Sequence, residues 1–203
     1  MLNIPSGKAS NVSFGPARVF MSKIVDGYDA DWSTTPMATP NTIASNDVGW
    51  IGEDGVTVEL SSEKKDITQG NPKLINYSFC QAQGATVKFS SIQWDFDNFS
   101  SALGAGATAG TGTAGSTDTF AFGGNALNDV VAMVVQHQMA TTGDTLTLFC
   151  WKVQSESGFS IPFGADEHSF EFGFKVVRSE YEWGGEALGT DEQLIRFNRW
   201  YAP

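Results

Sequence analysis

The aspartates that could bind a metal ion fall into two short groups. Asp95 and Asp97 form an Asp-x-Asp pair, but on a helix side chains two residues apart point away from each other. The other group, which resembles the opening of a calcium-binding loop, is Asp26, Asp29 and Asp31. The twelfth position counted from Asp26 is Met37, where such a loop carries a bidentate Glu. We therefore interpret the first group as solvated helix charges and the second as a polar turn, and predict no metal site.

Residues suited to catalysis are equally sparse. The two histidines are His137, inside an apolar run, and His168, just before another, and two are too few for a three-ligand catalytic zinc site. No G-x-S-x-G elbow presents a serine nucleophile. Residues 110–115 match G-x-G-x-x-G, but the dinucleotide fingerprint needs a strand before it and a helix after it. Here a low-complexity loop precedes the match and a strand follows, so we predict a non-enzymatic protein without a cofactor.

The composition describes an acidic chain that can fold. Its 203 residues are 41% hydrophobic and 12% aromatic, which is enough apolar surface to offset the entropy of ordering. It carries 23 acidic and 12 basic side chains, a net charge of -11. Residues 1–46 are neutral overall, so the excess acid lies in the rest of the chain. This balance disfavours a basic face that grips nucleic acid through counterion release.

Cysteine usage and hydropathy bear on the compartment. Cys80 and Cys150 each lie in an apolar, strand-like run, the usual place for a small buried thiol. We favour two reduced cysteines in a product of the cytoplasm, although the sequence leaves a disulfide between them open. The chain has no apolar run of about 18 residues, so we expect no membrane insertion.

The elements that would position these residues are mostly strands. Residues 56–63 alternate, with Val56, Val58 and Leu60 on one face and Thr57, Glu59, Ser61 and Glu63 on the other. Residues 73–81 alternate again, with Ile75, Tyr77 and Phe79 on one side. A charged connector separates the two runs, so we predict a hairpin with a long inter-strand loop. The other predicted strands are residues 14–23, 85–90, 117–122, 129–139, 145–153 and 169–178.

Helical spacing is persuasive only in residues 91–103. Ile92, Phe96, Phe99 and Leu103 make one apolar stripe, which predicts an amphipathic helix packed on a sheet. Residues 104–116, rich in Gly, Ala and Thr, lack bulky side chains and are predicted to form a flexible loop. A capping pattern at Thr190 and Gln193 predicts a short helix over residues 194–200.

Together these elements predict a mainly β fold, an antiparallel β-sandwich or barrel with one flanking amphipathic helix. We expect an N-terminal arm and lid in residues 1–46, the β-sandwich in residues 47–179, and an extended C-terminal arm in residues 180–203.

Residues 47–104 carry a resemblance to a known family. The sequence D-V-G-W-I-G-E-D-G-V-T-V-E-L at residues 47–60 leads into the charged connector, two further strands and the helix. This order resembles the major tail tube proteins of long-tailed, siphovirus-like bacteriophages, in which a glycine-flanked entry leads into a strand, a long inter-ring loop, two strands and an amphipathic helix.

The resemblance implies a structural virion protein. Its subunits would form rings, expected to be hexameric, whose strands join into an inner β-barrel, and the rings would stack into a tail tube. The expected partners are further copies of the chain, the tape measure protein, the tail terminator and the distal tail proteins. Assembly would take place in the host cytoplasm, and phage DNA would pass through the tube without tight binding.

Within that expectation, particular residues become candidates. A lumen that passes DNA should not attract phosphates, so Glu59 and Glu63 are candidates for an acidic lumen wall, although the same face could simply meet water. The candidates for inter-ring contact are the connector residues Lys64, Lys65, Asp66, Ile67, Thr68, Gln69 and Gly70. The candidates for anchors in the C-terminal arm are Tyr181, Trp183, Trp200 and Tyr201, because Trp and Tyr are enriched at interface hot spots.

The aromatic content keeps a second function open. Six Trp and 15 Phe in an acidic sandwich could supply stacking platforms for sugars. A carbohydrate-binding β-sandwich module is therefore the alternative, as is another phage head or tail component with the same fold.

Overall fold

The structure is a computed structural model. The residues that it describes are 17–24, 47–70, 74–93, 95–103, 106–108, 115–121, 130–140, 142–156, 158, 160–161, 168–183 and 185–201. Most of the predicted N-terminal arm, most of the Gly/Ala/Thr loop with its G-x-G-x-x-G match, and the aspartates at positions 26, 29 and 31 lie outside the described residues.

Four strands form the first layer of the fold. β6 (Val130–Gln138) pairs with β1 (Ala17–Lys23) on one side and β7 (Thr145–Ser155) on the other. The first half of β7 also pairs with β9 (Ile195–Trp200). All of these pairings are antiparallel. β1 belongs to the predicted arm region, so that region contributes an edge strand to the sheet.

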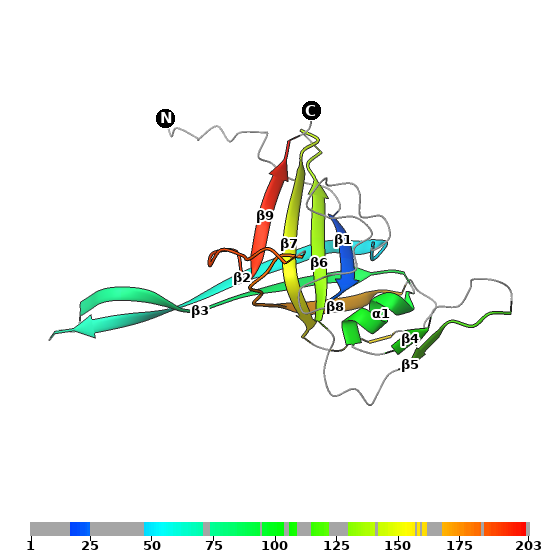
Figure 1. The fold of residues 1–203 in the computed structure, drawn as a ribbon, viewed down its shortest axis with the longest axis horizontal. Coiled ribbons are helices and arrows are strands. Elements are labelled where there is room, and N and C mark those ends of the chain that lie inside the picture. The colour runs from blue at the N-terminus through cyan, green and yellow to red at the C-terminus, as the bar shows by residue number, and fades with distance from the viewer. Residues whose placement is uncertain are drawn as a thin grey trace, which may run out of the picture.

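The second layer contains β8 (Phe170–Val177), β3 (Leu74–Ser91) and β2 (Ile51–Gln69). The last residues of β7 pair with β8, β8 pairs with β3, and β3 pairs with β2. The two layers are therefore one seven-stranded antiparallel sheet that folds over on itself. Figure 1 shows the second-layer strands running across those of the first. The described sheet is not closed into a barrel, and the predicted mainly β antiparallel sandwich with one helix is confirmed.

The main core fills the space between the layers. From the second layer it receives alternate residues of β8, Phe170, Phe172 and Phe174, which are at most 4% exposed. From the first layer it receives Met133 and Cys150 together with valines of β1 and β6. Each large side chain buried in this way contributes about 1.5–3 kcal/mol, and strict alternation is what places all three phenylalanines on one side of a strand.

The helix α1 (Phe96–Leu103) closes one end of the core. The Phe99 ring contacts Phe170 edge-on, with ring centroids 5.0 Å apart, and Phe120 from β5 (Thr119–Ala121), which pairs with β4 (Gly106–Thr108). The helix begins at residue 96 rather than residue 91, because the Asp95 carboxylate accepts a hydrogen bond from the Asp97 N–H at 2.9 Å and caps the helix there.

A second apolar cluster covers the outer face of the first layer. Phe20, Phe149 and Trp151 point away from the main core and pack with Trp183 and Leu188 of the segment that precedes β9. The indole N–H of Trp183 donates to the Trp151 carbonyl at 2.9 Å. The C-terminal region is thus packed on the sheet over much of its length.

Two sequence predictions are wrong. The helix predicted over residues 194–200 is instead the strand β9, because the backbone of residues 195–200 pairs antiparallel with β7. The long inter-strand loop is absent from the described residues, because β2 and β3 continue through the charged connector and turn only near Gly70, whose φ is +99°. The described part of residues 104–116 includes β4 as well as loop.

Candidate assembly surface

The outer part of the β2–β3 hairpin projects from the body as a two-stranded ribbon (Figure 1). β3 pairs with β8 only over residues 86–91, so in the described structure residues 60–69 and 74–85 have only each other as strand partners. We call these residues the ribbon. A two-stranded hairpin without a third strand or an element packed on it is marginally stable in water. The ribbon therefore needs something to cover it.

Large apolar side chains lie exposed along the ribbon. Ile67 is 52% exposed and Tyr77 is 64% exposed. The other exposed apolar residues of the ribbon are Leu60, Leu74, Ile75 and Phe79. These residues lie on both sides of the ribbon, and the register of β2 and β3 decides which of them share a face.

The side of the ribbon that carries the apolar residues changes along its length. Near the body the apolar residues of β2 are Val56, Val58 and Leu60, on the core side. The register then shifts between Glu63 and Lys64, which places the extra residue Gln81 in β3. Beyond this bulge the core side carries polar pairs such as Asp66 with Ser78, and the opposite side carries the apolar pair of Ile67 and Tyr77.

The opposite side of the distal ribbon includes two cross-strand pairs with large apolar side chains. Ile67 lies opposite Tyr77, and Lys65 lies opposite Phe79. Directly paired residues share a face of a sheet, so these four side chains form one surface, which we call the distal apolar face. A second register shift, between Ile67 and Thr68, separates Ile75 from Tyr77, so the predicted single stripe of Ile75, Tyr77 and Phe79 is broken.

The residues predicted for inter-ring contact lie on the ribbon and in the turn at its tip. They are Lys64, Lys65, Asp66, Ile67, Thr68, Gln69 and Gly70, six in β2 and the last in the turn. All are exposed, and the Asp66 carboxylate accepts a hydrogen bond from the Ser78 hydroxyl across the ribbon. Only Ile67 and Lys65 of this set belong to the distal apolar face.

The two predicted lumen residues lie on the polar outer face of the second layer. Glu59 and Glu63 are exposed there, and the Glu59 carboxylate lies 3.5 Å from the ammonium of Lys88. The Thr86 hydroxyl donates to the same carboxylate at 3.3 Å. The register places Lys175 and Glu171 of β8 on this face too. Three glutamates thus share the face with two lysines, which makes it nearly balanced in charge, and sequence reasoning missed the lysines.

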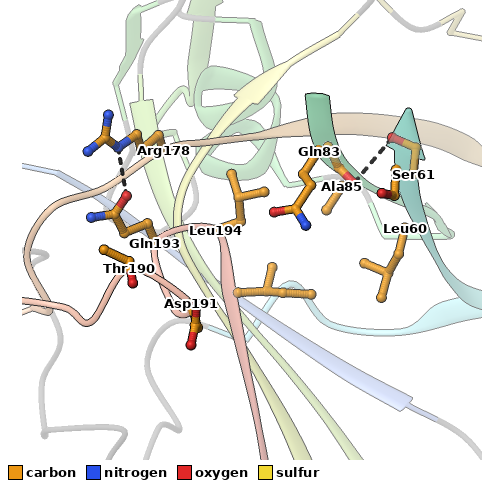
Figure 2. A pocket seen from close by; sticks show the side chains of 12 residues that line it. Leu60, Ser61, Gln83, Ala85, Arg178, Thr190, Asp191, Gln193 and Leu194 are labelled. Carbon is orange, nitrogen blue, oxygen red and sulfur yellow. Dashed lines mark hydrogen bonds between the residues drawn. The ribbon is translucent and has the colours of Figure 1, made fainter. Parts of the chain in front are cut away.

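A groove runs between the base of the ribbon and the segment that leads into β9 (Figure 2). Its volume is about 510 Å³. Leu60 and Ala85 form the ribbon wall, and Leu194 and Gln193 form the other wall, where the Arg178 guanidinium donates to the Gln193 amide oxygen at 2.8 Å. The groove leaves the core side of the ribbon base uncovered.

The four predicted anchors divide between surface and interior. Tyr181 and Tyr201 are exposed, Trp200 is half-buried, and Trp183 is only 8% exposed. The Trp183 ring meets the Trp151 ring edge-on, with centroids 5.0 Å apart. Trp183 therefore stabilises its own subunit, and the two tyrosines remain the candidates that a partner could reach.

The two cysteines are free and differ in environment. Cys80 is exposed on the ribbon, with its sulfur 3.4 Å from the Ser62 hydroxyl, whereas Cys150 is buried in the main core. Burial raises the pKa of the Cys150 thiol to about 12. The two sulfurs are not bonded to each other, so the pairing that the sequence left open is not formed here.

Asp95 and Asp97 lie at the start of α1, where Asp95 serves as the cap. Among the described residues no three His, Cys, Asp or Glu side chains gather where they could hold a metal ion. Within that same part of the chain, no helix is long and apolar enough to span a membrane.

Comparisons with known proteins add no family to these observations. The chain matches no protein-family model, and a search of curated proteins found no relative.

Proposed function

We propose that this chain is a structural subunit that assembles with copies of itself into stacked rings, forming a phage tail tube that conducts DNA. The observation that carries the proposal is the distal apolar face, which lies on the opposite side of the ribbon from the subunit's own core. Because this apolar surface faces away from the subunit's own core, it is available to bind another subunit. A head-to-tail contact of this kind repeats, giving rings where the rotation closes and filaments where it does not.

Under this proposal the polar outer face of β2, β3 and β8 lines the channel. The outer face of the first layer is covered, since it packs on Trp183 and Leu188. The outer face of the second layer is therefore the one left to line a channel. The near balance of Glu59, Glu63 and Glu171 against Lys88 and Lys175 supports free passage, because an excess of lysines would hold DNA through counterion release. At physiological salt, exposed charges more than about 8 Å from the wall are largely screened, so the residues of this face decide how the wall meets phosphates.

Electron microscopy of the concentrated full chain tests the proposal. Rings or tubes with an axial hole are the expected result. Particles that remain monomeric at every concentration would overturn it, and binding to a glycan array by those monomers would favour the carbohydrate-binding alternative.

A shortened ribbon provides the matched variant. Lys64 and Cys80 lie directly opposite each other, so an Asn-Gly turn between them would remove residues 65–79 and close a tight hairpin. The subunit should fold with an unchanged main core, since none of the removed residues belongs to it, but should no longer stack. Tubes of unchanged length from this variant would contradict a role for the ribbon in stacking.

A further inference from the structure

Trp50 is held in solvent by a rigid loop. Its side chain is 73% exposed, the most exposed tryptophan of the described residues. Its backbone is fixed at both ends, because the Trp50 N–H donates to the Gln93 side-chain oxygen at 3.0 Å and the Trp50 carbonyl accepts from the Ile92 N–H at 3.2 Å. The preceding Gly49 has a φ of +93°, and a Cβ there would lie 1.5 Å from the Gln93 oxygen, so only glycine fits.

The rest of this loop is braced against the body. The Val48 N–H donates to the Val19 carbonyl at 2.9 Å, and the Asn98 side chain donates to the Val48 carbonyl at 2.9 Å. Asp47 receives two hydrogen bonds from the Arg18 guanidinium, the shorter at 2.5 Å. A loop ordered to this degree, with an exposed tryptophan at its end, is preorganised for contact, since the ordering cost is met before binding.

Beside Trp50 the surface is hollowed. The hollow has a volume of about 600 Å³, and its main side chains are Trp50, Arg18, Asp47, Gln93 and Asp95. We call it the Trp50 hollow. Its two carboxylates outnumber its one guanidinium, so it carries a net negative charge. A tryptophan surrounded by polar groups that can exclude water is the usual form of an interface hot spot.

We propose that the Trp50 hollow binds the distal apolar face of the ribbon of a second copy of this chain. The chemistry is complementary: Ile67, Tyr77 and Phe79 supply apolar and aromatic surface for Trp50, and Lys65 in the same face supplies a positive charge for the acidic hollow. This inference rests on the proposed function in that both require self-assembly, and it names the surface that receives the ribbon.

The occupant must come from another copy because of where the two surfaces lie. Trp50 immediately precedes β2 and Ile67 lies near the far end of β2. Figure 1 shows β2 as one long strand that runs from the body to the tip of the ribbon. At roughly 3.3 Å per residue, the strand between them spans on the order of 50 Å. The ribbon therefore cannot reach its own hollow, and the contact repeats head to tail.

A mixing experiment with two blocked variants tests the contact. Trp50→Ala removes the hollow's anchor but keeps the ribbon, and Ile67→Asp with Tyr77→Asp blocks the ribbon but keeps the hollow. All three side chains are exposed, so thermal melts should stay close to that of the unaltered chain. Each variant alone should need at least ~30-fold more protein to stack. Mixed in equal amounts, they should form particles with twice the mass of either alone, which grow no further.

Mass photometry of the separate and mixed variants measures the particle masses. Ile161→Asp is the control, because it places a charge on an exposed isoleucine elsewhere and should leave the growth of stacked particles unchanged. A mixture that does not double in mass, while the unaltered chain still forms tubes, would overturn the contact and leave the proposed function standing. If the particle mass doubles in the mixture but the unaltered chain forms no tubes, the result would support the contact and overturn the proposed tail tube function.

Discussion

The carboxylate of Asp144 accepts two hydrogen bonds from the guanidinium of Arg199, from Nε at 3.0 Å and from Nη2 at 2.7 Å. Asp144 is 5% exposed and lies just before β7, whereas Arg199 lies in β9. The pair therefore ties the last strand of the chain to the turn that precedes β7.

Replacing Asp144 by Ala should destabilise the fold. The change removes the carboxylate that accepts two hydrogen bonds from the partly buried Arg199 guanidinium, and breaking a buried pair costs about 3–5 kcal/mol. Because the Arg199 side chain is 29% exposed and water can reach it, we expect a loss of about 1–3 kcal/mol. Urea denaturation measures it. Asp191→Ala removes an exposed carboxylate and should change the free energy of unfolding by less than ~0.5 kcal/mol, and equal losses in the two variants would contradict this role for Asp144.

Trp183→Ala should destabilise the isolated subunit. Trp183 packs on Trp151 and donates a hydrogen bond to its carbonyl, and removing a buried Trp costs about 3–5 kcal/mol. Tyr181→Ala, two residues away and exposed, should leave the melting temperature nearly unchanged. If Trp183 served mainly as an intersubunit anchor, its loss would reduce assembly without reducing monomer stability, which the thermal melt of dilute protein decides.

Strand alternation made much of the body predictable. The alternate phenylalanines of β8 and the apolar run of β6 identify buried strands from their period alone, and both strands lie within a residue or two of the predicted bounds. Residues 194–200 misled the prediction because Thr190 and Gln193 imitate a capping box. Pairing with β7 decided their conformation instead, and such a long-range contact leaves no local signal.

The ribbon shows why the candidate surface was only partly predictable. The sequence placed Ile67 among the candidates for inter-ring contact, but the face that it shares with Tyr77 depends on the bulge at Gln81. A one-residue shift of register reverses every side chain beyond it. In the sequence, Trp50 was only one residue of the glycine-rich entry motif, and no local pattern predicted that its side chain is exposed. Its exposure follows from hydrogen bonds to Gln93 and Ile92, more than 40 residues away in the chain.

Cys150 should make the fold sensitive to alkaline pH. An unfolded thiol ionises at a pKa of about 8.5, whereas burial raises the pKa of Cys150 in the folded chain to about 12. The unfolded state therefore releases a proton that the folded state keeps, so this contribution to stability is complete below the unfolded pKa and is lost as the pH rises toward 12.

The measurement is the free energy of unfolding against pH from 8 to 11. The slope should reach about -1.4 kcal/mol for each pH unit above the unfolded pKa, and Cys150→Ala should flatten it even though the cavity lowers stability at every pH. Cys80→Ala, which removes the exposed thiol, should leave the slope unchanged. A Cys150→Ala variant with the original slope would assign the effect to other groups.

Reversing the charge of the polar outer face should obstruct DNA while leaving assembly intact. Glu59→Lys with Glu63→Lys turns a face with three glutamates and two lysines into one with a clear basic excess, and Glu59 loses its attraction to Lys88. Such a wall would hold phosphates by counterion release. Neither side chain belongs to the core or to the distal apolar face, so tubes should still form, and DNA should bind them in a salt-sensitive manner. Glu180→Lys with Glu186→Lys makes the same change in net charge on exposed residues of the C-terminal segment. If both double variants bind DNA equally, the polar outer face is not the wall of the channel.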